Sequence, residues 1–247
     1  MNRRVVLAAT TAAVLTMTGG FVFGAANIPA YVSAAVADTN RPKAQTDVDA
    51  MRHPAEMMAF AMVKPGDKVV EIWPGGGYVT RLLSKIVGPA GKVYALNAPS
   101  WPDRLKGAIK AVTDNPAYSN VMVVEQPLEQ IKPPGPVDVV WTSENYHDFQ
   151  NNGPFKADTM AMNKAIFAAL KPGGYYIVTD YVSAPGAGKT VTQSLHRIDP
   201  DVIRQEATAA GFMLDSQSDV LKNPGEALTE HSHQGSSQVM LRFRKPR

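Results

Sequence analysis

The stretch VVEIWPGGGYVTRLL, residues Val69–Leu83, decides the fold class. The β-branched run at residues 68–73 predicts a strand, and Pro74 is expected to end it because proline holds the preceding residue extended. Three glycines follow directly, and apolar residues then recur with helical spacing up to Val87. The stretch therefore predicts a strand, a tight glycine turn and a helix.

The same alternation continues through most of the chain. Further strands are predicted at residues 92–97, 120–125, 136–143 and 175–182, with helices at 101–112 and 156–171 between them. Strands alternating with helices favour right-handed crossovers, so we expect an α/β fold with a doubly wound, mainly parallel sheet.

The end of the chain breaks this alternation. After a helix at residues 199–212, two strands at 213–221 and 236–246 have no helical pattern between them. We therefore expect a C-terminal antiparallel hairpin, which brings the sheet to seven strands. The polar segment at residues 222–235 is long enough to be an insertion or a lid.

The first residues are typical of an export signal. Residues 1–37 contain no Asp, Glu or Lys, and Arg3 and Arg4 precede a long apolar stretch. Small residues at 35–37 form a cleavage pattern, and residues 24–26 offer a competing one; an uncleaved anchor and a twin-arginine signal stay open as alternatives. We expect residues 38–46 to be a polar arm and 47–247 the folded domain. The protein is then periplasmic or extracellular, without stable membrane insertion once the signal is removed.

Charge excludes some partners. Without residues 1–37 the chain keeps 23 basic and 22 acidic residues, a net charge of +1, and these charges are interspersed. A nucleic-acid-binding protein needs clustered Lys and Arg, so we expect a small-molecule substrate and no nucleic acid. The absence of cysteine excludes disulfides and a cysteine nucleophile.

The glycine turn can hold a ligand or only make a sharp corner. Glycine accepts positive φ and lets a ligand approach the backbone, and the following helix offers free amide groups. The spacing lacks the third glycine of the dinucleotide fingerprint and the Lys-Ser/Thr of a phosphate-binding loop. By the same test, SAPGAGKT at residues 183–190 is not a phosphate-binding loop, because Ser183 replaces its first glycine.

Several segments together resemble a known superfamily. The glycine turn with its flanking strands, PVDVVWTSENYHDF at residues 136–149, ALKPGGYYIVTDY at 169–181 and the final hairpin resemble class I S-adenosylmethionine-dependent methyltransferases. More narrowly, EIWPGGG, NYHDF and HRIDPDVIRQEATAAGF resemble an exported predicted methyltransferase family. The resemblance implies a Rossmann-like fold and S-adenosylmethionine as the cofactor.

The resemblance also implies which residues bind the cofactor. Glu71 would hold its amino-acid part, Gly75, Gly76 and Gly77 would admit its backbone and sugar, and Trp73 would shield the pocket or face the sulfonium. Asn97 stands where the superfamily has an acid for the ribose hydroxyls, and an amide has only one acceptor oxygen. Residues near the adenine would be Gln126 and Leu128.

The segment SENYHDF supplies the candidate catalytic residues. Methyl transfer needs an aligned nucleophile and, for a hydroxyl, a base. His147 is the candidate base because histidine titrates near neutrality, and Asp148 or Glu144 would orient it. A purely structural polar cap stays open as the alternative.

We expect no metal site. Glu230, His231 and His233 could chelate an ion, but a polar loop without further ligands is the simpler interpretation. His53 and His196 are single histidines that would shape the substrate side of the pocket. The sequence thus predicts methyl transfer to an unidentified, small-molecule acceptor; an exported, non-catalytic ligand-binding protein on the same scaffold is the alternative.

Overall fold

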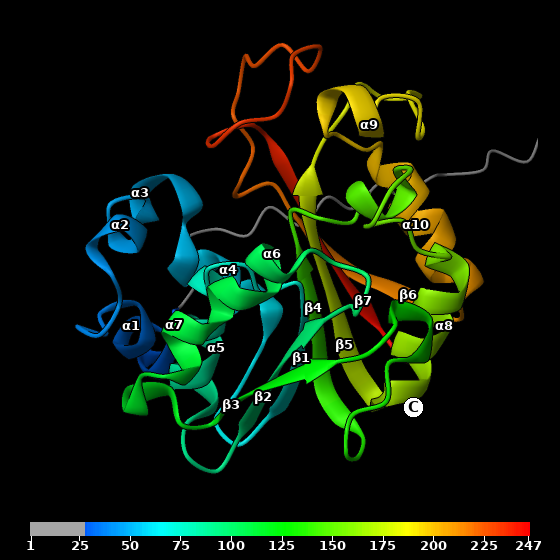
Figure 1. The fold of residues 1–247 in the computed structure, drawn as a ribbon. Helices are drawn as coiled ribbons and strands as arrows, with labels where there is room; N and C mark the ends of the chain where they lie inside the picture. The colour runs from blue at the N-terminus through cyan, green and yellow to red at the C-terminus, as the bar shows by residue number, and fades with distance from the viewer. Residues whose placement is uncertain (1–27) are drawn as a thin grey trace, which may run out of the picture.

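The computed structural model describes residues 28–247, which form one seven-stranded sheet with helices on both faces (Figure 1). The strand order is β3-β2-β1-β4-β5-β7-β6. The strands are β1 Lys68–Ile72, β2 Lys92–Asn97, β3 Val121–Glu125, β4 Val137–Ser143, β5 Leu170–Tyr181, β6 Met213–Ser218 and β7 Gln238–Arg244. The first five pair in parallel, whereas β7 is antiparallel to both β5 and β6. The predicted α/β fold and its C-terminal hairpin are confirmed.

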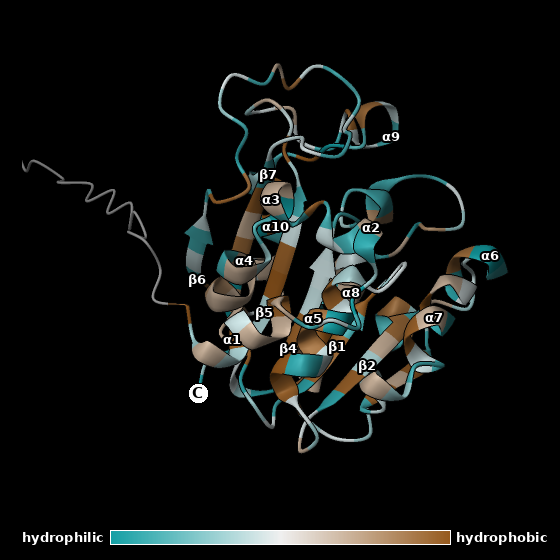
Figure 2. Ribbon diagram, turned by 90° about the vertical axis from the view of Figure 1, so that its left-hand side faces the viewer, coloured by the Kyte–Doolittle hydropathy of each residue, from teal (hydrophilic) through white to brown (hydrophobic). Residues whose placement is uncertain are grey.

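Helices cover each face because successive strand residues point to opposite sides of the sheet. Val69 packs with the helices of one face and Val70 with those of the other. The first face carries α1 Ala30–Val36, α4 Pro54–Ala61, α5 Tyr78–Val87 and α7 Lys110–Thr113; the second carries α8 Thr159–Ala169 and α10 Pro200–Ala209 (Figure 1). Figure 2 shows the hydrophobic strands β1, β2 and β4 between these layers.

Short helices fill the connections. They are α2 Lys43–Thr46, α3 Asp49–Arg52, α6 Asp103–Lys106, α9 Thr192–Leu195 and the 3₁₀ turns η1 Gly107–Ile109, η2 Pro116–Tyr118, η3 Leu128–Gln130 and η4 Asp148–Gln150. The prediction of one continuous helix at residues 101–112 is wrong, because this segment is divided into α6, η1 and α7. The helix predicted at 156–171 ends earlier, at Ala169, because β5 begins at Leu170.

The N-terminal segment lies against the domain. In α1, Val32 and Ala35 are buried in the core beside α5. Asp38 accepts a hydrogen bond from the Tyr118 hydroxyl at 2.8 Å, and the buried Arg41 is paired with Asp49, so the predicted polar arm is docked. Residues 1–27 of the predicted export signal lie outside the described residues, and export stays a prediction. Cleavage after Ala37 would remove α1, whereas cleavage near residue 26 would keep it.

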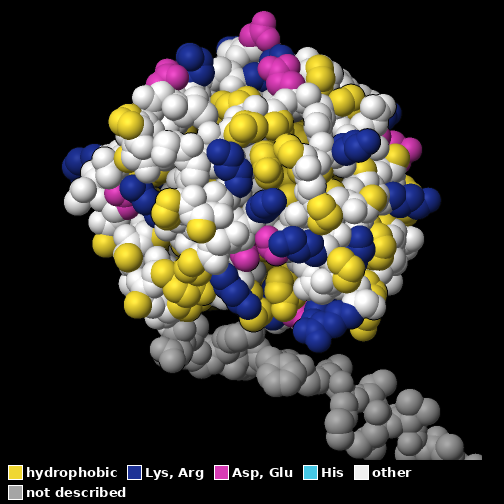
Figure 3. Space-filling view, turned by 90° about the horizontal axis from the view of Figure 1, so that it is seen from below, with side chains coloured by type: hydrophobic (Ala, Val, Ile, Leu, Met, Phe, Trp, Pro, Cys, Tyr) yellow, Lys and Arg dark blue, Asp and Glu magenta, His cyan; other side chains and the backbone are white. Residues whose placement is uncertain are grey.

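The described residues contain no helix that is long and apolar enough to cross a membrane. Seen from below, Lys and Arg side chains are dispersed among apolar and acidic ones (Figure 3). On this face they form no continuous basic surface.

We expect α1 to contribute to stability. A chain that begins at Asp38 loses the buried Val32 and Ala35, and burying one valine is worth about 1.5–3 kcal/mol. Its unfolding midpoint in urea should fall below that of a chain that begins at Ile28. Equal midpoints would show that α1 adds nothing to the fold.

Candidate functional site

The turn after β1 depends on an unusual backbone. Trp73, Gly75 and Gly77 all have positive φ, at 55°, 53° and 79°. A Cβ on Gly77 would lie 2.3 Å from Val112 Cγ2, so only glycine fits where α5 begins. A left-handed tryptophan is a strained exception, since such backbone is rare for bulky residues.

A cavity of about 260 Å³ opens at this turn. A Cβ on Gly75 or Gly76 would meet nothing within 4 Å, so the backbone faces open space there. The lining residues come from the turn, from the end of β4 and from the N-terminal segment. They are Gln45, Arg52, Glu71, Trp73, Pro74, Gly75, Gly76, Tyr78, Val79, Ser143, Glu144, Asn145 and Asp148. Such a cradle suits a ligand that approaches the main chain closely.

Glu71 is the buried acid of this cavity. Its side chain is 3% exposed, and its Oε2 has no hydrogen-bond partner among the described residues. Burial raises the pKa of Glu71 to about 7, although the Thr80 hydroxyl acts in the opposite direction. An unpartnered buried carboxylate is costly, so a cationic ligand group beside it would be favoured.

The aromatic side chains near the turn pack together. Trp73 stacks on Phe155 with ring centroids 4.5 Å apart and lies 4.8 Å from the ring of Trp101. Trp73 also lines the cavity. Trp73 therefore packs against two aromatic rings and also lines the predicted cofactor pocket.

Four predicted cofactor residues lie outside the lining of this cavity: Gly77, Asn97, Gln126 and Leu128. Asn97 is 1% exposed at the end of β2, and its Nδ2 has no hydrogen-bond partner within residues 28–247. The Gln126 side chain donates to the Lys132 carbonyl and accepts from the Lys132 amide, at 3.1 and 2.8 Å. Leu128 is buried in the core. Their contacts with a ribose or an adenine stay a prediction.

His147 lies at the end of β4 and is held by Asp180 from β5. The His147 Nδ1 is 2.7 Å from Asp180 Oδ1, and Asp180 Oδ2 accepts from the His147 amide at 2.7 Å. Asp180 thus orients the imidazole, in place of Asp148 or Glu144. Burial lowers the pKa of His147, but the Asp180 carboxylate outweighs it, and the pKa is raised overall.

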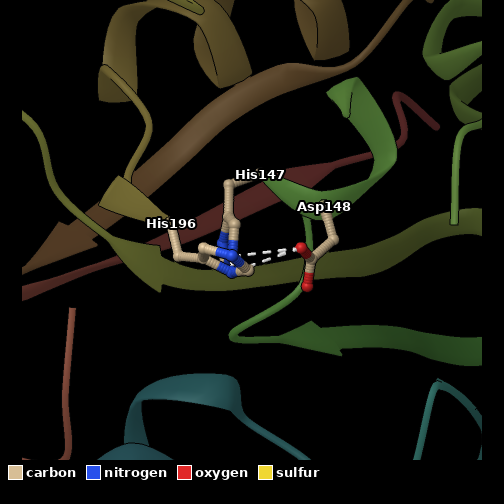
Figure 4. Close-up of side chains that lie close together, drawn as sticks. All are labelled: His147, Asp148 and His196. Carbon is tan, nitrogen blue, oxygen red and sulfur yellow. Dashed lines mark hydrogen bonds and ion pairs between the residues drawn. The ribbon is translucent and has the colours of Figure 1, made fainter. Parts of the chain in front are cut away.

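The free nitrogen of His147 faces a second histidine. Its Nε2 lies 3.3 Å from His196 Nδ1, and Asp148 Oδ1 lies 3.5 Å from each of these nitrogens (Figure 4). His147 is 2% exposed and lines neither cavity at this edge of the sheet, whereas Asp148 lines the smaller one. His147 therefore faces this cluster, and contact with an acceptor stays a prediction.

A larger cavity of about 660 Å³ adjoins the first. Both cavities are lined by Arg52 and Glu144, which form an ion pair. The larger one is also lined by His53 just before α4, Tyr181 at the end of β5, Lys222, Asn223 and His233 from the segment before β7, and Gln238 at the start of β7. Glu144 has a left-handed backbone, with φ of 59°, that places its side chain at this junction.

The comparisons with known proteins agree with this geometry. The sequence profile of the protein-L-isoaspartate(D-aspartate) O-methyltransferase (PCMT) family matches residues 8–132. The chain belongs to this family. Its fold also matches the crystal structure of a SAM-dependent methyltransferase from Aquifex aeolicus, with a TM-score of 0.55 and 18% identity, over 76% of this chain and 87% of that one.

Two curated relatives are also methyltransferases. A protein-L-isoaspartate O-methyltransferase from Ignicoccus hospitalis is 35% identical over 28% of this chain and 32% of its own length. The ubiquinone/menaquinone biosynthesis C-methyltransferase UbiE of Ectopseudomonas mendocina is 26% identical over 72% of this chain and 64% of its own. The chain thus spans between about one third and two thirds of these relatives.

Family and fold support S-adenosylmethionine as the cofactor, and the residues present fit it. The open space at Gly75 and Gly76 lets the cofactor approach the main chain of the turn. The Glu71 oxygen that has no partner among the described residues suits the ammonium group of the cofactor. The class I methyltransferase assignment made from the sequence is confirmed at the level of the superfamily.

The sequence-based prediction missed several residues of the site. Gln45 donates to the Gly76 carbonyl at 3.1 Å, and Arg52 lies over the Tyr78 ring at 4.5 Å and pairs with Glu144. These contacts join distant segments and leave no local pattern. Asp180 could have been found, because an acid at the end of the strand beside β4 must lie at the same edge of the sheet.

Replacing Glu71 should separate stability from binding. The folded pKa of about 7 exceeds the ordinary 4.5, so the folded state holds the proton more tightly. This proton therefore stabilises the folded state, by at most about 3 kcal/mol. The stabilisation is complete below about pH 4.5 and is lost as the pH rises through about 7. We expect Glu71→Gln to raise the unfolding temperature at pH 8 more than at pH 5, and to weaken S-adenosylmethionine binding measured by calorimetry.

The exposed Glu230→Gln replacement is the control and should change neither property. An unfolding temperature that falls at pH 8 in Glu71→Gln would contradict the buried, costly carboxylate.

Proposed function

We propose that this protein transfers the methyl group of S-adenosylmethionine to a small acceptor that carries an anionic group. The observation that carries the proposal is the junction of the two cavities. The glycine cradle lines the smaller one, the larger one is of a size for a small molecule, and Arg52 and Glu144 belong to both. An acceptor in the larger cavity would meet the cofactor at this ion pair.

The lining of the larger cavity indicates the chemistry of the acceptor. Arg52, Lys222, His53 and His233 bring basic groups, and Glu144 is the acid that opposes them. An acceptor with a carboxylate or phosphate group would compensate the charges of Arg52 and Lys222 and could accept hydrogen bonds from the histidines. The relatives that are protein-L-isoaspartate O-methyltransferases make an isoaspartyl peptide the macromolecular alternative to test.

When bound, S-adenosylmethionine would supply an electrophilic methyl group, which would pass from its sulfur to the nucleophile of the acceptor, with S-adenosylhomocysteine as the leaving group. Glu144 would hydrogen-bond to the nucleophile and take its proton, and Arg52 and Gln238 would fix the carboxylate, since Gln238 Nε2 donates to it at 3.1 Å. Tyr78 and Gln45 would hold the cradle under the N-terminal segment.

The cradle can be tested by filling it. In Gly75→Val the side chain projects into the open space of the turn, so we expect S-adenosylmethionine and S-adenosylhomocysteine to bind at least tenfold more weakly in calorimetry. Gly66→Val is the matched control, because Gly66 also has positive φ and open space around it but precedes β1 at the other end of the strand. Unchanged binding to a folded Gly75→Val protein would refute the cradle.

The role of Glu144 can be tested once an acceptor is found. A screen with labelled S-adenosylmethionine would cover small carboxylates and phosphates and an isoaspartyl peptide. With the best acceptor that is methylated on a hydroxyl or an amine, Glu144→Gln should lower kcat about 10²- to 10⁴-fold while cofactor affinity is kept. If only the peptide is methylated, the acceptor is a protein and the proposal of a small acceptor is wrong. If kcat is unchanged in Glu144→Gln, Glu144 is not the base.

A further inference from the structure

The cluster of His147, Asp148 and His196 has the form of a metal site. It joins the segment after β4 with the residue that follows α9, which are far apart in the sequence (Figure 4). The three ligand atoms, His147 Nε2, His196 Nδ1 and Asp148 Oδ1, form a triangle with sides of 3.3, 3.5 and 3.5 Å.

The size of this triangle favours one class of ion. Zinc binds nitrogen and oxygen at about 2.0–2.1 Å in a tetrahedron, so two of its ligands stand about 3.4 Å apart. An octahedral magnesium ion with bonds of about 2.0–2.1 Å would need neighbours about 2.9 Å apart. Two imidazoles and one carboxylate are also the ligand types of zinc and similar transition metals, whereas magnesium prefers oxygen.

Asp180 prepares His147 for such a role. Its carboxylate accepts the proton of His147 Nδ1, which leaves the lone pair of Nε2 directed at the cluster. Asp180 is completely buried and also fixes the His147 backbone through its amide. A carboxylate on the outer nitrogen of a histidine is the usual support of a metal ligand.

Contacts of neighbouring residues fix the position of His196. Its φ of 49° is left-handed, which is uncommon for a residue other than glycine, although histidine adopts it more often than most. The adjacent Arg197 is fully buried, donates to the Val182 carbonyl at 3.0 Å and pairs with Glu226. The ring of His231 packs against that of His196, with centroids 4.7 Å apart.

We propose that His147, Asp148 and His196 bind one divalent transition-metal ion of the zinc type, with the fourth position open. Three protein ligands with an open position are typical of sites that hold water or a substrate oxygen. Asp148 also lines the cofactor cavity, so the ion would lie beside the methyl-transfer site. With Nε2 on the metal, His147 is a ligand and no longer a free base. This replaces the sequence-based expectation of a chain without a metal.

The test is metal binding by the full chain without a polyhistidine tag. After removal of metals with a chelator, we expect one Zn²⁺ per chain by elemental analysis and competitive titration. Co²⁺ should give the intense visible bands of a tetrahedral site. His196→Ala and Asp148→Asn should each lower the affinity at least 100-fold, whereas His233→Ala, the matched histidine outside the cluster, should leave it unchanged.

The Asp180→Asn variant tests whether Asp180 only positions His147 or itself binds the metal ion. It should lower the affinity for Zn²⁺ about 10- to 100-fold without abolishing binding. The proposal is overturned if the folded wild-type chain does not bind micromolar Zn²⁺, or if the ion binds equally well to His196→Ala and Asp148→Asn. Circular dichroism of each variant shows that it is folded. Because cofactor binding is measured separately with Gly75→Val, failure here leaves the proposed methyl transfer intact.

Discussion

The parallel pairing of β1 with β4 is the constraint on which the site depends. Parallel neighbours end at the same edge of a sheet, so the glycine turn after Ile72 lies beside the segment that follows Ser143. Asn145, which is buried, joins the two by donating to the Ile72 carbonyl at 3.3 Å. The cradle and the acid at the junction follow from this adjacency, and the pairing of β4 with β5 adds Asp180 beside His147.

This edge concentrates buried polar groups, which a stable core alone would not favour. Glu71 has an unpartnered oxygen, Asp180 is completely buried, and Trp73 and Glu144 have left-handed backbones. Each of these features is unfavourable by itself, and strain of this kind persists where the surrounding structure imposes it. The apolar packing on both faces of the sheet supplies the stability that offsets them.

The N-terminal segment lines the cavities on the side opposite the strand ends. Gln45 contacts the glycine turn, Arg52 spans from the Tyr78 ring to Glu144, and Asp49 holds both Arg41 and the Tyr78 hydroxyl. The two cavities are therefore distinct spaces that share the Arg52–Glu144 pair.

The sequence by itself determined the alternation of strands and helices, the closing hairpin and the glycine turn with Glu71, because these are local patterns of periodicity and turn chemistry. It also placed Glu144, His147 and Asp148 at the end of a strand. Only the tertiary structure decided that Asp180, and not Asp148, orients His147, that Arg52 meets Glu144, and that His196 joins the cluster. These contacts join residues 33, 92 and 49 positions apart, so they are set by strand pairing and loop packing and have no local signature.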